Sequence, residues 1–302
     1  PDTVAFILCY STNLSFTPIT NELPPCLFPL CNIPVLFYGI QWLYNNGIKK
    51  IYIICPESNK KPIQNFLNEI QEKLKIKSIE ILVPNSNYSI SCISDSIKWI
   101  HSSSSILLNF KNCLILSGTI VTNIPLKSII EKVDERSIVT TIFTKTKSNG
   151  YSAIVDDEGF LLQLSIPSMF DFDKNKRPNI DRKSGGLKVE TGLNNSLIYI
   201  VTPEFMSIFS SNNFLGCNSI MNDCVPSLID HEKDKKAVSA FILPDSFYSS
   251  DINDISNYIN SSIEIIKHHL SPFSIDLNLL GPWQTYTHLY DDSDDDNAEE
   301  DE

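Results

Sequence analysis

Glycine is scarce in this sequence, and it is missing where a phosphate-binding loop would need it. The 302 residues include ten glycines, and none precedes Gly39. The apolar run VAFILCY at residues 4–10 predicts a buried strand, and a helical pattern opens near Pro34. In a nucleotide-binding strand–turn–helix unit, glycines in the turn let backbone N–H groups approach a phosphate. Their absence excludes a glycine-rich phosphate loop at this junction.

Long apolar runs and an excess of positive charge are also missing. No stretch approaches the roughly 18 apolar residues of a membrane-spanning helix, so no membrane contact is expected. The formal net charge is −12, but residues 291–302 alone carry nine acids and no base, and 24 bases nearly balance the other 27 acids. Direct nucleic-acid binding needs a basic face, so it is not expected. We expect residues 291–302 to be a disordered, solvated tail, with docking to a basic partner as the alternative.

Closely spaced cysteine pairs are the third absence. The eight cysteines are dispersed without any C-x-x-C pair, and most lie in apolar runs such as IYIIC and NCLIL. This pattern predicts buried free thiols in the reducing cytoplasm and argues against a zinc site or a disulfide framework. No metal and no cofactor are expected.

Alternating strand and helix patterns dominate the first half of the chain. Runs rich in Ile and Val predict strands, and amphipathic stretches between them predict helices, such as residues 60–74 with an apolar stripe. The expected strands are residues 4–10, 49–55, 78–83, 112–118 and 136–144; the expected helices are residues 34–47, 60–74, 93–100 and 125–133. This order predicts an α/β fold, a mostly parallel sheet flanked by helices in a Rossmann-like three-layer arrangement.

The pattern changes after Gly150. Residues 151–165 predict a hairpin that turns at Asp157-Glu158-Gly159, and residues 170–186 predict a long exposed loop. A buried strand at 196–201 and three helices follow, the first with Thr202 as N-cap and the last, near residue 255, capped by Asp251 or Asn253. We expect these antiparallel additions to extend or cover one end of the parallel sheet.

Two motifs near the N-terminus resemble those of sugar-phosphate nucleotidyltransferases. PPCLFP at residues 24–29 and NIPVLFY at residues 32–38 are similar to the P-K-x-L-L-P and K-P-L-I-x-Y motifs of that family. The family's loop glycines and arginine fall on CYSTNLSF, residues 9–16, and its lysine falls on Pro25. The resemblance therefore implies a nucleotide-binding frame without its phosphate-contacting residues.

The segments that resemble the family's metal-binding motifs likewise keep the surrounding residues but lack some of the residues that bind the metal. The family's G-D, whose aspartate holds the catalytic Mg²⁺, aligns with Gly118-Thr119, and its N-x-G-I-Y glycine aligns with Leu197. The later D-I-G-T-P segment keeps its acid as Asp251. A neutral threonine hydroxyl cannot replace a carboxylate on Mg²⁺, and each loss is expected to lower the rate by orders of magnitude. We therefore expect no catalytic residue, and we treat Pro25, Thr119 and Asp251 as degenerate nucleotide and metal positions.

A closer resemblance is to the epsilon subunit of eukaryotic translation initiation factor 2B. Residues 16–55, the LSGTIVTNIPLKSIIEKV segment and the NLL…QTYT pieces before residue 290 are similar to parts of that subunit. The gamma subunit is the close rival, because VETGLNNSLIYIV and DCVPSLI resemble it more. The resemblance implies a partner-binding role for an N-F-D motif, of which Asn213 and Phe214 remain.

The resemblance implies an interaction protein of the cytoplasm rather than an enzyme. This segment of a guanine-nucleotide exchange factor would pair with the gamma-type subunit and bind initiation factor 2, and an active sugar-phosphate nucleotidyltransferase is the alternative. We expect residues 1–270 to form the nucleotidyltransferase-like domain and residues 271–290 to connect toward a β-helix domain that lies outside this sequence. Because the chain begins at Pro1, we expect it to be a piece of a longer protein.

Overall fold

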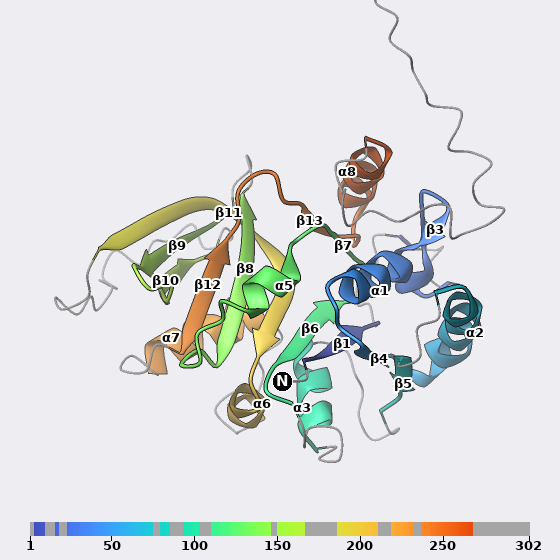
Figure 1. Cartoon of the computed structure of the whole chain (residues 1–302), viewed down its shortest axis with the longest axis horizontal. Helices are drawn as coiled ribbons and strands as arrows, with labels where there is room; N and C mark the ends of the chain where they lie inside the picture. The colour runs from blue at the N-terminus through green and yellow to red at the C-terminus, as the bar shows by residue number, and fades with distance from the viewer. Residues whose placement is uncertain are drawn as a thin grey trace, which may run out of the picture.

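The protein has three layers, with helices on both faces of a central sheet (Figure 1). The computed structural model describes residues 3–9, 16–17, 23–74, 79–84, 93–102, 110–145, 150–166, 186–210, 219–231 and 237–267. The mostly parallel sheet flanked by helices, predicted from the alternating pattern, is confirmed. Among the described residues, no helix is long and apolar enough to cross a membrane.

In the described part of the chain, nine strands form the central sheet in the order β10-β9-β11-β6-β1-β4-β5, with β8 paired to β11 and β12 paired to β8. β1 runs parallel to β4 and β6, and β4 runs parallel to β5. The carboxyl ends of these four strands therefore meet at one edge. The strands are β1 (Val4–Leu8), β4 (Lys50–Ile54), β5 (Ile79–Leu82), β6 (Cys113–Ser117), β8 (Val139–Lys145), β9 (Tyr151–Asp156), β10 (Leu161–Ser165), β11 (Leu187–Val201) and β12 (Val238–Ile242).

An apolar core lies on each face of the sheet, between the strands and the helices that cover them. One core lies between the sheet and α1, α2 and α5, and the other between the sheet and α3, α6 and α7. The stripe predicted on α2 is confirmed at Ile63, Leu67 and Ile70, which are buried. The helices are α1 (Val35–Asn45), α2 (Glu57–Leu74), α3 (Ile93–Ser102), α5 (Leu126–Ile130), α6 (Pro203–Phe209) and α7 (Val225–His231), the last preceded by a π-helical turn, η4 (Ile220–Cys224).

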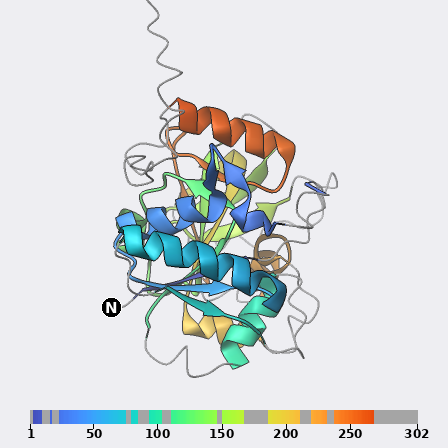
Figure 2. The same cartoon turned by 90° about the vertical axis from the view of Figure 1, so that its right-hand side faces the viewer.

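Smaller elements surround the carboxyl edge of the sheet. A 3₁₀ turn, η2, precedes the two-residue strands β2 and β3, while β7 and β13 form a separate antiparallel pair. Helix α8 follows β13 and lies at the outside of the molecule (Figures 1 and 2). Their bounds are η2 (Pro25–Leu27), β2 (Pro29–Leu30), β3 (Ile33–Pro34), β7 (Ile120–Thr122), β13 (Ser249–Asp251) and α8 (Ile255–Ile266).

The antiparallel half departs from the sequence predictions in two ways. The 157–159 turn is confirmed, with Gly159 at φ +90°, but β11 begins at Leu187 rather than at residue 196. Strands β7, β12 and β13 were not predicted. The loop expected at residues 170–186 lies outside the described residues except for Gly186. Together β9, β10 and the first half of β11 form an arm that extends the sheet (Figure 1).

Helix caps were predicted with mixed success. Thr202 caps α6 as expected, and its hydroxyl accepts a hydrogen bond from the Phe205 N–H. The prediction that Asp251 or Asn253 caps α8 was wrong: the cap is Asp254, whose carboxylate accepts from the Asn257 N–H at 2.7 Å. Asp251 is unavailable because its backbone pairs with Ile120 as the end of β13.

Candidate functional site

The candidate site is the edge where the parallel strands end. Ligands of open α/β sheets bind in the crevice outside these carboxyl ends. Here Cys9 follows β1, Cys55 follows β4 and Gly118 follows β6. Hydrogen bonds lock the three strand ends together: the Cys9 N–H donates to Ile54 O and the Gly118 N–H donates to Leu8 O, both at 2.8 Å.

Buried thiols fill this edge. Cys9, Cys26 of η2 and Cys55 are all less than 5% exposed. A Cβ atom added at Gly118 would lie 2.5 Å from Cys9 Sγ and 3.3 Å from Cys26 Cβ, so no free space remains beside this glycine. Burial raises the pKa of Cys9 well above its usual value and that of Cys55 to about 12, which keeps both thiols neutral.

This thiol cluster confirms the prediction of buried free cysteines at the positions that the structure describes. Cys31 is partly exposed, whereas Cys9, Cys26, Cys55, Cys113 and Cys224 are buried; all six are free. Sequence reasoning did not predict that three of them meet at one edge of the sheet. The available signal was that Cys9 and Cys55 each follow a predicted strand directly.

Two of the degenerate positions, Thr119 and Asp251, are in direct contact. The Thr119 hydroxyl donates a hydrogen bond to Asp251 Oδ1 at 2.5 Å and lies 2.8 Å from Ser117 Oγ. The backbone holds this geometry, because Ile252 N–H donates to Thr119 O at 2.9 Å and β13 pairs with β7. The structure thus brings together the two positions that the metal motifs singled out, although they are 132 residues apart.

The electrostatics around Asp251 disfavour its charged form. Burial raises the pKa of Asp251, the nearby Asp254 raises it further, and the hydrogen bonds from Thr119 and Ser117 oppose the shift. A Mg²⁺ site requires ionised oxygen ligands arranged around an octahedral ion.

The residues at this position do not fit such an ion. Thr119 supplies a neutral hydroxyl already donated to Asp251, and the Asp254 carboxylate caps α8. Across the described part of the chain, no group of three His, Cys, Asp or Glu side chains could hold a metal.

The other predicted site residues have different outcomes. Pro25 is the first residue of η2 and lies next to the buried Cys26, so the position that aligns with the family's lysine is at this edge but offers neither charge nor an N–H donor. Asn213 and Phe214 lie outside the described residues.

Leu197 occupies a backbone conformation that normally requires glycine. Its φ is +57°, within the left-handed region, at an irregularity in the pairing of β11 with β8. The Asn195 side chain supports this turn of the strand: its Oδ1 accepts from the Leu197 N–H at 3.0 Å and its Nδ2 donates to the Tyr199 hydroxyl at 2.7 Å. A non-glycine residue here is strained, since L-residues rarely adopt positive φ. The position that aligns with the family's glycine thus has a backbone conformation that glycine adopts most easily.

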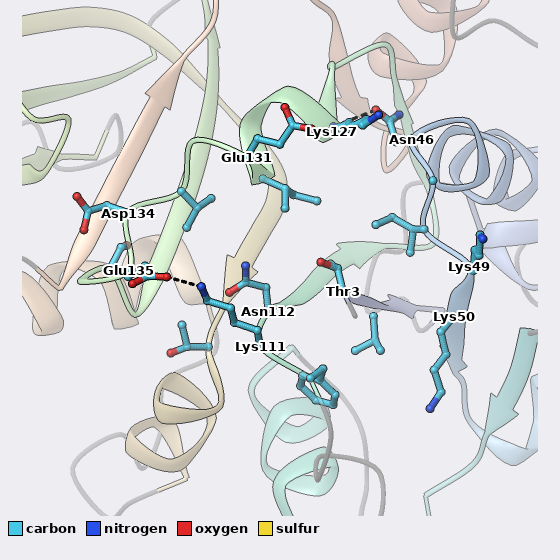
Figure 3. A pocket seen from close by; sticks show the side chains of 18 residues that line it. Thr3, Asn46, Lys49, Lys50, Lys111, Asn112, Lys127, Glu131, Asp134 and Glu135 are labelled. Carbon is cyan, nitrogen blue, oxygen red and sulfur yellow. Dashed lines mark hydrogen bonds and ion pairs between the residues drawn. The ribbon is translucent and has the colours of Figure 1, made fainter. Parts of the chain in front are cut away.

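A cleft of about 990 Å³ lies at the opposite edge of the sheet, among the amino ends of β1, β4 and β6 (Figure 3). Lysines and acids both line it, and the Lys111 ammonium pairs with Glu135 at 2.5 Å. Asn46, the C-cap of α1, also lies here, and helix C-termini favour cations over anions. The acids and the helix C-terminus among these lysines therefore make the cleft a poor fit for a phosphate ligand. Its ionisable lining residues are Lys49, Lys50, Lys111, Lys127, Glu131, Asp134 and Glu135.

Comparison with known proteins first defines the class. Residues 14–159 match the family described as Nucleotidyl transferase. Two solved structures share the fold. One is described as a glucose-1-phosphate thymidylyltransferase from Bacillus anthracis, with a TM-score of 0.61 and 13% identity; the match covers 86% of this chain and 94% of the other. The second is the inositol-1-phosphate CTP transferase from T. maritima, with a TM-score of 0.61 and 10% identity; the match covers 90% of this chain and 97% of the other. The chain therefore has a nucleotidyltransferase-like fold.

The particular relatives are subunits of a translation factor. The chain is 22% identical to translation initiation factor eIF2B subunit epsilon of Schizosaccharomyces pombe over 94% of its own length. It is 20% identical to the Dictyostelium discoideum protein of the same name over 91%. The resemblance to the epsilon subunit is thereby confirmed. The chain spans 43% and 40% of these relatives, or about two fifths of their length.

Proposed function

We propose that this chain is a catalytically degenerate nucleotidyltransferase-like domain of an epsilon-type subunit of initiation factor 2B, and that it serves subunit assembly and partner binding. The observation that carries the proposal is the hydrogen bond from Thr119 to Asp251. It joins a neutral hydroxyl to a desolvated carboxyl at the position where the related enzymes' motif would hold Mg²⁺. The fold supports nucleotide chemistry only if that chemistry's residues are present.

The electrostatic requirement of the reaction supports this conclusion. Transfer of a nucleotidyl group needs cations that neutralise the charge developing on the phosphates. At this edge, Pro25 stands at the lysine position, Thr119 stands at a carboxylate position, and burial raises the pKa of Asp251. Cys9, the first residue after β1, is a buried neutral thiol rather than a loop residue open to a ligand. These residues supply neither the metal ligands nor the positive charge that the reaction requires.

We propose the partners from the resemblance to the epsilon subunit. A gamma-type subunit would pair with this domain in a cytoplasmic multisubunit complex, and the assembly would act on initiation factor 2 as a guanine-nucleotide exchange factor. Residues 1–270 would form the domain, residues 271–290 would connect it to a β-helix domain, and residues 291–302 would form an acidic tail. Asn213 and Phe214 remain candidates for contact with a partner.

Two experiments on the 302-residue chain test this function. Co-expression with a gamma-type subunit from the same source is expected to yield a stable complex; failure to co-purify would count against the assembly role. Pyrophosphate release from nucleoside triphosphates and a panel of sugar phosphates is expected to stay at background. Release above background, raised further by Thr119→Asp, would instead support an active transferase.

A further inference from the structure

Helix α8 carries an exposed apolar stripe. Ile255, Ile259, Ile263 and Ile266 are 59%, 51%, 41% and 54% exposed. Their spacing of four, four and three residues places them on one face of the helix. The described residues include seven exposed large hydrophobic side chains, and these four isoleucines make up more than half of them. We call these four residues the isoleucine stripe.

The opposite side of α8 is the side that attaches it to the domain. The Tyr258 hydroxyl donates to Pro29 O at 3.0 Å, and its ring contacts Phe28 edge-on with centroids 5.4 Å apart. Ser261 is fully buried and its hydroxyl lies 2.8 Å from that of Tyr248. Because α8 lies at the outside of the molecule (Figures 1 and 2), the stripe has no cover among the described residues.

The sequence that leaves the C-terminal end of α8 has the complementary pattern. Residues 273–279 read FSIDLNL, with apolar side chains at every second position and polar side chains between them. Strict alternation is typical of an extended segment with one apolar face. Burying that apolar face away from water requires a second apolar surface to pack against it. The apolar members are Phe273, Ile275, Leu277 and Leu279, and the polar members are Ser274, Asp276 and Asn278.

The two patterns also match in length. Residues four apart on a helix are separated by about 6 Å along its axis, and alternate residues of an extended strand by about 6.7 Å. The four isoleucines extend over 11 helical steps, or about 16 Å, while the four apolar residues extend over six strand steps, or about 20 Å. Residues 268–272, HHLSP, provide enough chain to reverse direction, and Pro272 favours an extended conformation for the residue before it.

We propose that residues 273–279 run back along α8 in extended conformation and cover the isoleucine stripe with their apolar face. The occupant is this chain's own segment because only six residues, 267–272, separate it from the end of α8 at Ile266, which makes its local concentration far higher than that of any separate partner. The consequence is an anchored exit from the domain. The sequence after residue 279 then leaves from the amino end of α8 rather than from its carboxyl end.

Hydrogen–deuterium exchange of the α8 amides in the 302-residue chain tests this proposal. Leu277→Asp places a charge on the apolar face of the segment, so exchange in α8 is expected to accelerate about tenfold as local opening becomes easier. The matched control Asn278→Asp adds the same charge one residue further, on the polar face, and is expected to leave exchange unchanged. Reciprocally, Ile259→Asp is expected to accelerate exchange in residues 273–279, whereas Asn260→Asp is not.

Each other outcome overturns the proposal. Unchanged α8 exchange in Leu277→Asp would show that the segment does not cover the helix. Equal acceleration by Leu277→Asp and Asn278→Asp would show an effect of charge rather than of one face. Protection of α8 that disappears on tenfold dilution would identify a second copy as the occupant. Protection that appears only when the gamma-type subunit is added would identify that subunit instead.

Discussion

Gly118→Ala is the sharpest test of how tightly the candidate site is closed. The new Cβ would lie 2.5 Å from Cys9 Sγ, 3.2 Å from Leu8 O and 3.3 Å from Cys26 Cβ. The first contact is far inside van der Waals distance, and the second is to a backbone atom that hydrogen bonds fix in the sheet. Overpacking of this kind destabilises by about 1–3 kcal/mol. We expect about 2 kcal/mol, which lowers the thermal midpoint by about 3 °C, because the unfolding entropy is about 2.1 cal/mol/K per residue.

The assay is thermal unfolding followed by circular dichroism, with Gly39→Ala as the matched control. A Cβ at Gly39, in α1, would meet Ile120 only at 3.7 Å and beyond, which is ordinary contact. Alanine in a helix is favoured over glycine by up to about 1 kcal/mol, so this control is expected to hold or raise the midpoint. In a Cys9→Ala background the loss caused by Gly118→Ala is expected to shrink, because the closest atom is gone. An unchanged midpoint for Gly118→Ala would refute the closed site.

Three further predictions concern residues around the same edge. In urea unfolding, Leu197→Gly is expected to be more stable than Leu197→Ala by about 1 kcal/mol. Alanine at this left-handed position carries a strain of about 1–2 kcal/mol, whereas the greater conformational entropy of glycine in the unfolded chain costs only about 0.5–1 kcal/mol. If the alanine variant were the more stable of the two, that order would contradict the φ of +57°. Burial raises the folded-state pKa of Asp251 above its ordinary value of 3.8, so the folded state binds its proton more tightly and this group's stabilisation is lost as the pH rises through the raised value. The urea midpoint of Asp251→Asn relative to the parent chain is therefore expected to rise from about pH 3 to pH 7, and a falling difference would reverse the assigned sign. Asp254→Ala removes the cap of α8 and is expected to lower the free energy of unfolding by about 1 kcal/mol, whereas Asp254→Asn keeps a capping oxygen and loses little; equal losses in the two variants would rule out the cap.

Burial explains which strands could be predicted from the sequence. The residues of β1 and most of those of β4 and β6 are buried, so each reads as a short apolar run. The first half of β11 is different, because Leu187 and Val189 are exposed and the strand forms by pairing its backbone with β9. Backbone pairing between distant segments leaves little trace in composition, which is why the strand was predicted only from residue 196 onward.

At the candidate site, the sequence identified the residues but not the contacts between them. Resemblance to nucleotidyltransferases singled out Thr119, Asp251 and Leu197, and the structure gives each a distinct physical role. The resemblance could not reveal that the Thr119 hydroxyl donates a hydrogen bond to Asp251, since that contact depends on the pairing of β7 with β13. Two short strands of three residues each have no periodicity to read.

The wrong cap assignment has the same origin. Asp251, Asn253 and Asp254 all precede α8 and are all good capping residues. Strand β13 ends at Asp251 and α8 begins at Ile255, so Asp254 is the residue that stands at the N-cap position. A local preference was thus decided by a tertiary contact.

Calorimetric titration of the 302-residue chain with a magnesium–nucleoside triphosphate tests the central claim most directly. Because the Thr119 hydroxyl is bound to Asp251, Pro25 carries no charge and neutral thiols fill the strand ends, we expect no heat of binding above dilution for ATP, GTP, CTP or UTP. Saturable binding of any of these that is lost on adding a chelator or in Asp251→Asn would contradict the account, because it would show that this edge of the sheet still holds a metal and a triphosphate.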